Sequence, residues 1–177
     1  MSAMKAGVTL ALIVAVGASL AVATSQNRTQ TKTKKMTVEE TSPKRPDKVV
    51  KTDAEWKAQL TEMQYKILRH GATEAPFCGV FFDNHKTGVY HCAGCNLPLF
   101  KSDAKFDSGT GWPSFFQPYE RKNIWMRTDR SHGMIRWETL CARCDGHLGH
   151  VFTDGPAPSG LRYCINSDSL VFEEKKK

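Results

Sequence analysis

Residues 141–152 read CARCDGHLGHVF and combine a C-x-x-C pair, two histidines and a short apolar run. A C-x-x-C turn directs two cysteine sulfurs at one point, as structural zinc sites require. A second pair, CAGC at residues 92–95, stands 45 residues upstream. Four thiolates complete a tetrahedron around one ion, so we expect a single structural Zn²⁺ per chain, bound by Cys92, Cys95, Cys141 and Cys144.

Two other interpretations of the cysteine pairs stay open at this point. Each pair could form a disulfide, which the export signal described below would permit. A redox-active C-x-x-C pair is the weaker rival. Zinc is preferred because two pairs within one short domain match the ligand count of a closed structural site.

Short β-prone runs separated by turn residues follow the chain from Pro76 onward. They are typical of a small antiparallel β domain and not of a parallel α/β sheet, so the expected fold class is mainly β. The chain has no GxGxxG, P-loop or GxSxG motif and no internal repeat. The runs are residues 80–82, 88–91, 99–100, 135–140, 148–152, 161–165 and 170–172, and the turn signals between them include SGTGWP at residues 108–113.

Helix signals precede these runs. TDAE at residues 52–55 and TEMQ at residues 61–64 both match the capping box, in which a threonine and an acidic or amide side chain cap a helix start. Apolar residues then recur at helical spacing as far as Gly71, which favours a helix end. We expect one broken helix or two short helices here.

The first 23 residues are predicted to be a secretory signal peptide. Lys5 precedes an apolar run at residues 8–23, which ends in Ala21-Val22-Ala23. A membrane anchor is the second interpretation, because the run is close to the shortest that spans a bilayer. An organellar transit peptide is the third. We therefore expect an exported protein, periplasmic or secreted, with membrane-anchored or organellar placement as the alternatives.

Residues 24–51 carry eight Lys or Arg and three acidic side chains, with few large apolar groups. Such a segment buries too little surface to offset its chain entropy, so we expect a basic disordered linker. The domain at residues 52–177 carries 16 basic and 15 acidic side chains. A domain that binds nucleic acid would carry its own basic face, so no nucleic-acid partner is expected.

Cys164 lies in the β-prone segment 161–165, where strand alternation places Arg162, Cys164 and Asn166 on one face. The arginine charge should favour the thiolate, the nucleophilic form of cysteine. A buried, inert cysteine is an equal alternative on this segment alone.

Two histidines, His147 and His150, follow the second cysteine pair. Zinc ligation or support of the ligands is the plainer interpretation. Four cysteines already saturate a zinc ion, however, so both imidazoles stay free for acid–base chemistry. A thiol with histidines elsewhere in the chain is a known catalytic arrangement.

Several long segments of the domain form a distinctive pattern. They are GATEAPF at residues 71–77, KFDSGTGWPSF at 105–115, RSHGM at 130–134, HLGHVFTDGP at 147–156 and RYCINS at 162–167. Together they resemble the peptide-methionine (R)-sulfoxide reductase family, in its zinc-containing form, over roughly residues 60–172. The resemblance implies two antiparallel sheets with short N-terminal helices and a zinc site made of four cysteines.

The resemblance also implies a mechanism and its partners. Cys164 would attack the sulfur of a methionine sulfoxide in an oxidised protein, while His147 or His150 protonates the departing oxygen. Trp112 would form a wall for the substrate methyl group, Arg162 would also lie at the substrate, and Asn166 would orient substrate or imidazole. Cys164 would become a sulfenic acid, later reduced by thioredoxin or an equivalent dithiol. The enzyme is expected to act as a monomer.

The sequence departs from the family pattern at one position. Many members carry a resolving cysteine just before the Gly-Trp-Pro-Ser-Phe segment, where this chain has Thr110. Cys78 is the one cysteine left unassigned, so we predict that it is the resolving thiol. The alternative is that Cys78 only packs and an external thiol reduces the sulfenic acid directly.

Two functions of other classes are kept as rivals. One is a zinc-stapled β module that binds a partner without catalysis, which has no need to keep Cys164, His147, His150 and Asn166 together. The other is a secreted domain stapled by disulfides and free of metal, which metal analysis would identify.

Overall fold

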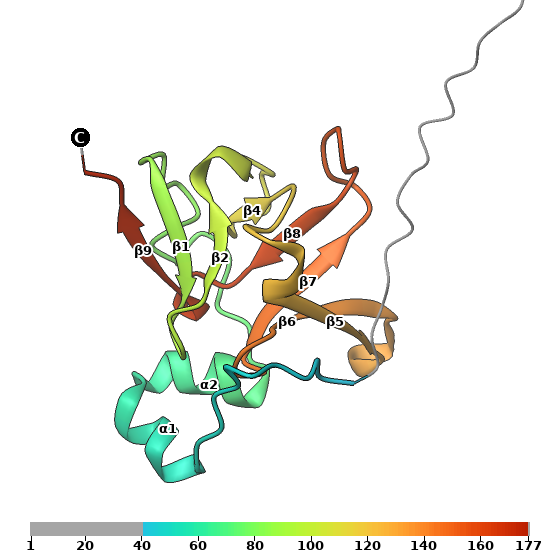
Figure 1. The fold of residues 1–177 in the computed structure, drawn as a ribbon. Coiled ribbons are helices and arrows are strands. Elements are labelled where there is room, and N and C mark those ends of the chain that lie inside the picture. Colours follow the sequence, from blue (N-terminus) through green and yellow to red (C-terminus); the bar gives the residue numbers. More distant parts are fainter. Residues whose placement is uncertain (1–40, 177) are drawn as a thin grey trace, which may run out of the picture. The chain divides into compact units, whose positions relative to one another are not determined.

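The computed structural model describes residues 41–176, so the expected signal segment at 1–23 and most of the expected linker lie outside the described residues. Within this range two helices precede two antiparallel β-sheets, as Figure 1 shows. The expected mainly β architecture is therefore confirmed. None of the helices in this part of the chain is long and apolar enough to span a bilayer.

The two helices begin and end where the capping signals placed them. Helix α1 (Asp53–Gln59) and helix α2 (Glu62–His70) each start with a complete capping box. Helix α2 ends at Gly71, which adopts the left-handed conformation with φ of 67°. Since each threonine must adopt extended geometry to cap its helix, Thr61 separates the segment into two helices.

The smaller sheet has the strand order β2-β1-β9, and the larger has the order β3-β4-β8-β7-β6-β5. The strand pairings of both sheets are antiparallel. The strands of the smaller sheet are β1 (Gly88–Cys92), β2 (Pro98–Lys101) and β9 (Leu170–Glu174). Those of the larger are β3 (Lys105–Phe106), β4 (Ser114–Phe115), β5 (Ile124–Asp129), β6 (Arg136–Cys141), β7 (His147–Phe152) and β8 (Arg162–Ile165). Short 3₁₀ turns occupy Ser102–Ala104, Arg121–Asn123, Ser131–Gly133 and Ser167–Ser169.

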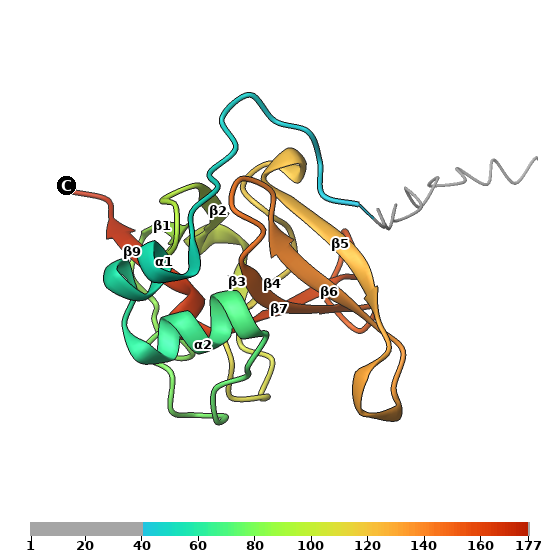
Figure 2. The same cartoon turned by 90° about the horizontal axis from the view of Figure 1, so that it is seen from below.

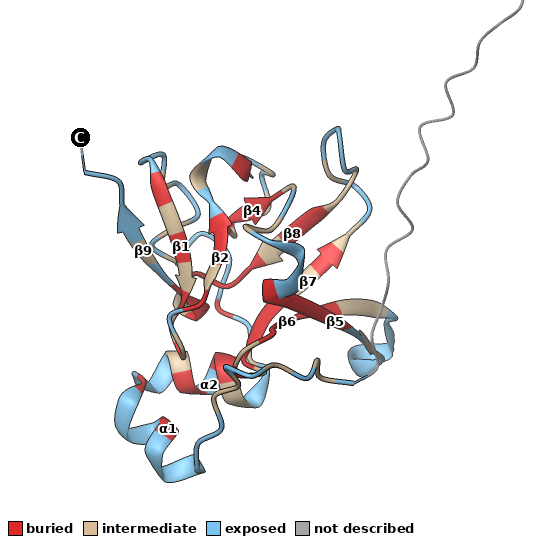
Figure 3. Ribbon diagram, in the orientation of Figure 1, coloured by how far each residue is buried: buried red, intermediate tan, exposed pale blue. Residues whose placement is uncertain are grey.

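Aromatic side chains join the two sheets into one core. Phe100 of β2 stacks on Phe115 of β4, with ring centroids 4.4 Å apart, and Tyr90 of β1 meets Phe115 at 5.1 Å. All three side chains are fully buried. Buried positions gather on the facing strands and on the inner sides of both helices, as Figure 3 shows. Burial of such large rings is the main stabilising contribution between the sheets.

Two differences from the sequence expectations concern strands. Residues 80–82 were expected to be β-prone, but they form consecutive turns in which Val80 is 79% exposed. Without a neighbouring strand and a buried face, β propensity does not produce a strand. Conversely, β5 was not expected. Its first half, Ile124–Met126, is buried throughout, so it lacks the alternation of buried and exposed residues that marks a strand in a sequence.

Each C-x-x-C pair forms the turn of a β-hairpin. The first pair joins β1 to β2, and the second joins β6 to β7. The two turns have the same backbone: Asn96 and Asp145 follow the pairs with φ near 60°, and their N–H groups donate to the carbonyls of Cys92 and Cys141 at 2.8 and 2.9 Å. Two like hairpins thus present their sulfurs in the same way.

Residues 42–49 lie on the second of these turns, although the expected linker extended to residue 51. Lys48 Nζ bonds Asp145 Oδ1 at 2.8 Å and the Ala142 carbonyl at 3.0 Å, and the Val49 N–H donates to the Arg143 carbonyl. Composition did not reveal this segment, because it is held by polar contacts to groups distant in sequence and not by its own apolar surface. Ordered contacts therefore begin ten residues before the expected start at Thr52.

We predict that Lys48→Ala lowers the free energy of unfolding by about 1 kcal/mol, because it removes three hydrogen bonds donated by a charged group at a half-buried position. Lys66→Ala is the matched control, since Lys66 pairs with exposed Glu62 on α2. Urea unfolding followed by tryptophan fluorescence measures both variants. Equal effects of the two substitutions would contradict a stabilising role for residues 42–49.

Candidate active site

A row of polar side chains crosses the larger sheet. Pairing between neighbouring strands places Glu138 of β6 opposite His150 of β7, His150 opposite Cys164 of β8, and Cys164 opposite Ser114 of β4. Arg127 of β5 stands opposite Glu138 and extends the row. Directly paired residues in a sheet project to the same face, so five strands contribute to one surface.

A cavity of about 150 Å³ lies beside this row. Its lining is mostly apolar with a few polar groups, as ligand pockets usually are. It brings together four of the residues singled out from the sequence, which are Cys164, His150, Asn166 and Trp112. The remaining lining residues are Thr73, Arg136, Gly149, Phe152 and Ile165.

Cys164 is half-buried at this cavity and forms no disulfide. Burial raises the pKa of the Cys164 thiol above its ordinary value, and the charge of Arg162 opposes this shift only in part. Arg162 thus acts in the expected direction, toward the thiolate, but burial outweighs its effect on the pKa. At neutral pH the resting residue is a protonated thiol, because desolvation outweighs the nearby charge.

Arg162 lies on the same strand face as Cys164 but is not among the residues that line the cavity. Its guanidinium makes two hydrogen bonds of 2.9 Å to the Asp154 carboxylate, and it lies 4.4 Å above the Phe152 ring. The carboxylate raises the pKa of Arg162 and keeps it charged. The side chain is thus a fixed positive charge near the sulfur.

His150 faces both the cavity and the charged end of β5. Its Nε2 lies 2.8 Å from Asp129 Oδ2. Burial lowers the pKa of His150, while the hydrogen bond to Asp129 opposes that shift. The imidazole is therefore neutral at neutral pH, directly opposite the Cys164 thiol.

His147 is buried behind His150 and does not line the cavity. Its Nδ1 lies 2.8 Å from Glu138 Oε1, and the two imidazole rings meet edge to face with centroids 5.5 Å apart. Its Nε2 is buried and has no hydrogen-bond partner among the described residues. The structure thus separates the two histidines that the sequence could not rank.

Glu74, which the sequence did not single out, braces the opposite wall of the cavity. Its backbone carbonyl accepts the Trp112 indole N–H at 3.1 Å, and its own N–H donates to Asn166 Oδ1 at 3.1 Å. Asn166 also donates to the Leu148 carbonyl at 3.0 Å. Both cavity residues are held through their polar atoms, so they form a rigid wall.

Burial raises the pKa of the Glu74 carboxyl, which accepts the N–H groups of Ser167 and Asp168 at 2.7 and 3.0 Å. This contact ties the segment after α2 to the turn that follows β8. No local pattern marks the residue, because its partners lie more than ninety positions away. The sequence also missed Asp129 and Arg136, because their roles depend on the register of β5 and β6.

Cys78 is exposed, on a loop that contacts the active-site loops at two points. The N–H of Phe77 donates to the Gly111 carbonyl at 2.8 Å, and the N–H of Phe81 donates to Ser167 Oγ at 3.3 Å. Thr110, next to Gly111, has its hydroxyl 4.0 Å from Cys164 Sγ. Cys78 is thus carried by a loop anchored on both sides of Cys164, and it does not line the cavity.

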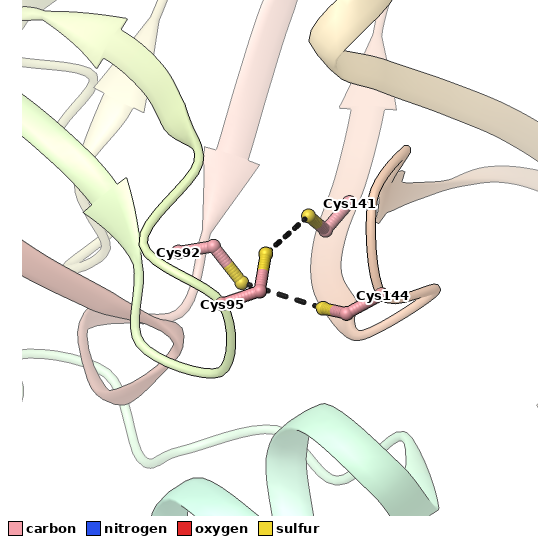
Figure 4. A group of neighbouring side chains, drawn as sticks. All are labelled: Cys92, Cys95, Cys141 and Cys144. Atoms are coloured by element: carbon pink, nitrogen blue, oxygen red, sulfur yellow. Dashed lines mark hydrogen bonds between the residues drawn. The ribbon is translucent and has the colours of Figure 1, made fainter. Parts of the chain in front are cut away.

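The four remaining cysteines converge between the two hairpin turns, as Figure 4 shows. Their sulfurs all lie within 4.8 Å of one another, with Cys92–Cys144 at 3.7 Å and Cys95–Cys141 at 3.5 Å. A tetrahedral ion with metal–sulfur bonds of about 2.3 Å separates its sulfurs by about 3.8 Å. The sulfurs are free of disulfides, so the site fits a four-coordinate metal and not two disulfides.

Helix α2 covers this metal site. A Cβ added at Gly146 would come within 2.9 Å of the Leu68 side chain and 3.3 Å of Cys144 Sγ, so the turn packs closely against the helix. Arg69 donates to the Cys144 carbonyl at 2.9 Å. With four sulfur ligands no position would stay open for a substrate, so a metal bound by these cysteines would be structural.

The chain is similar to proteins of a known family. The SelR domain family matches residues 60–174. Proteins named peptide methionine sulfoxide reductase MsrB are similar along nearly their whole length. That of Herminiimonas arsenicoxydans is 59% identical over 127 residues, covering 72% of this chain and 93% of the relative. That of Methylibium petroleiphilum is 59% identical over 132 residues (75% and 96%), and that of Leptospira interrogans 54% over 127 residues (72% and 97%). The chain therefore belongs to the SelR domain family, the family of the MsrB peptide methionine sulfoxide reductases.

Proposed function

We propose that the protein reduces methionine (R)-sulfoxide in oxidised proteins to methionine and so repairs oxidative damage. The observation that carries the proposal is the direct pairing of Cys164 with His150 at a cavity that Trp112 also lines. Relatives that match most of the domain bear the name of this activity. We infer the preference for the (R) epimer from the resemblance of the motifs around these residues to those of the peptide-methionine (R)-sulfoxide reductases.

In the proposed reaction Cys164 attacks the sulfur of the sulfoxide. The thiol proton passes through the neutral His150 imidazole to the sulfoxide oxygen. The attack forms a bond between the two sulfurs. That bond breaks again as the protonated oxygen leaves the substrate sulfur and bonds to the Cys164 sulfur. A thiol and a sulfoxide thereby become a sulfenic acid and a methionine, with the substrate reduced and the cysteine oxidised.

The walls of the cavity position the substrate for this attack. Trp112 and Phe152 offer aromatic surface to the methyl group bound to the sulfoxide sulfur. Asn166 shapes the wall, since both ends of its amide already have partners. Arg162, held by Asp154, supports negative charge that develops on the Cys164 sulfur.

Regeneration uses a second thiol and an external reductant. Cys78 condenses with the Cys164 sulfenic acid, so that water leaves and a disulfide forms. A thioredoxin-like dithiol then reduces this disulfide by exchange. The anchored position of the Cys78 loop beside Gly111 and Ser167 supports the assignment, as does the threonine at position 110.

We propose that the metal is Zn²⁺, because four cysteine ligands without a carboxylate or histidine favour it. We also propose export of the protein, as a monomer. The support for export is the run at residues 8–23 with its preceding Lys5.

We predict that Cys164→Ser abolishes sulfoxide reduction, because a hydroxyl cannot form the sulfenic acid. Wild-type and variant proteins are assayed with the (R) and (S) epimers of a blocked methionine sulfoxide. The wild-type enzyme should consume the (R) epimer alone. Unchanged metal content and thermal unfolding serve as controls for the fold. Turnover by the variant would remove Cys164 from its role, and absence of turnover by the wild type would favour a binding module.

A second substitution tests regeneration. Cys78→Ser should release about one methionine per enzyme in a single turnover and then recycle slowly with thioredoxin, because no intramolecular thiol can form the disulfide. Quenched-flow measurement of methionine against time separates the burst from the steady state. An unchanged steady-state rate would show that an external thiol reduces the sulfenic acid directly.

Metal removal gives an independent prediction. Elemental analysis of the purified protein should find about one zinc per chain, and Cys95→Ser should lose it with a marked fall in unfolding temperature, since metal binding stabilises the folded state. Ser108→Ala is a control outside the cysteine cluster. A variant without metal that keeps the wild-type unfolding temperature would contradict a structural ion.

A further inference from the structure

Asp129 is the last residue of β5 and pairs with Arg136, the first residue of β6. The turn between these strands extends beyond the rest of the sheet, as Figure 2 shows. Asp129 itself does not line the cavity, but two residues that do, His150 and Arg136, contact its carboxylate.

The Asp129 carboxylate is held from three directions. Its Oδ1 accepts the Ser131 N–H at 2.8 Å, and its Oδ2 accepts Arg136 Nη2 at 2.7 Å and lies 2.8 Å from His150 Nε2. Burial acts to raise the pKa of Asp129, but these hydrogen bonds outweigh it and leave the pKa well below its ordinary value. An ionised carboxylate has no hydrogen to donate, so it acts purely as an acceptor.

We propose that Asp129 is a positioning residue that holds His150 in the tautomer carrying hydrogen on Nε2, which leaves Nδ1 as the basic nitrogen for the Cys164 proton. The assignment follows from the contact itself. A neutral imidazole has one N–H and one lone pair, and the nitrogen that faces an ionised carboxylate must be the one that bears the hydrogen.

The charged and titratable groups around His150 are consistent with a neutral ring. Asp129 of β5 opposes the effect of burial on its pKa, whereas Arg136 of β6 and His147 of β7 lower the pKa further. Glu138 is opposite His150 in register, but its carboxylate bonds His147 and Arg127 instead. On β8 the neighbours are Cys164, whose pKa burial raises, and Arg162, whose charge Asp154 pairs.

His147 provides an internal contrast. Its Nδ1, and not its Nε2, faces a carboxylate, that of Glu138. Burial acts to raise the pKa of Glu138, but hydrogen bonds from His147 and Arg127 lower it below its ordinary value. The Glu138 carboxylate is therefore ionised and accepts hydrogen bonds, like that of Asp129. The two neighbouring histidines therefore carry their hydrogens on different nitrogens. Of the two, only His150 combines an Nδ1 that faces no carboxylate with a place at the cavity.

The inference rests on the proposed function for the role of the Nδ1 lone pair, although the tautomer can be measured without any reaction. Nitrogen-15 NMR of the full-length, metal-containing protein at neutral pH distinguishes the two tautomers through couplings to the ring protons. We expect Nε2–H for His150 and Nδ1–H for His147, assigned with His150→Gln and His147→Gln.

Asp129→Asn should lower kcat about tenfold or more, with KM within about twofold of the wild-type value, because the ring loses a charged group that only accepts and faces an amide that can donate to Nε2, while the cavity stays intact. It should also change the nitrogen shifts of His150. Glu138→Gln is the matched variant, since it removes the carboxylate of the other pair and should change the nitrogen shifts of His147 while leaving the His150 tautomer in place.

The outcomes separate this inference from the proposed function. Nδ1–H at His150 in the wild-type protein, or an Asp129→Asn variant with unchanged kcat and unchanged His150 shifts, would overturn the positioning role. The expected tautomers in a protein without reductase activity would instead overturn the proposed function and leave the hydrogen-bond assignment standing.

Discussion

The antiparallel pairing of β7 with β8 is the constraint on which the active site depends. It sets His150 opposite Cys164, and the adjacent residue Gly149 allows the two strands to approach closely. A Cβ at Gly149 would lie 2.1 Å from the Cys164 carbonyl oxygen, so any other residue would push the strands apart. Because a slip of one residue in a strand sends its side chains to the other face, this register alone decides whether thiol and imidazole meet.

A metal in the cysteine cluster would stabilise the same pairing from a distance. The second C-x-x-C turn closes the β6–β7 hairpin, and His147 begins β7 three residues after Cys144. Helix α2 and residues 42–49 hold this turn from two sides, through Arg69 and Lys48. A metal bound by both hairpins would join the smaller sheet to the larger one. In the proposed function it would support the register of β7 and β8 without taking part in the chemistry.

Features encoded in short local patterns could be predicted from the sequence. The capping boxes and the convergence of the cysteine pairs were confirmed, because capping boxes and C-x-x-C turns each depend on neighbouring residues. Features that depend on register or burial could not. Strand β5 and the brace at Glu74 have partners far along the chain, and the charge of Arg162 proved weaker than desolvation of the Cys164 thiol.

In the proposed mechanism, the resting enzyme holds a protonated thiol opposite a neutral imidazole. The most direct measurement is the rate at which iodoacetamide alkylates Cys164, followed by peptide mass spectrometry from about pH 6 to about pH 10. Only the thiolate reacts, so a raised pKa predicts slow alkylation at neutral pH, with the midpoint of the rate above about 8.5, the ordinary value for cysteine. A rate that is already at its plateau at neutral pH would show a stable thiolate and contradict the account.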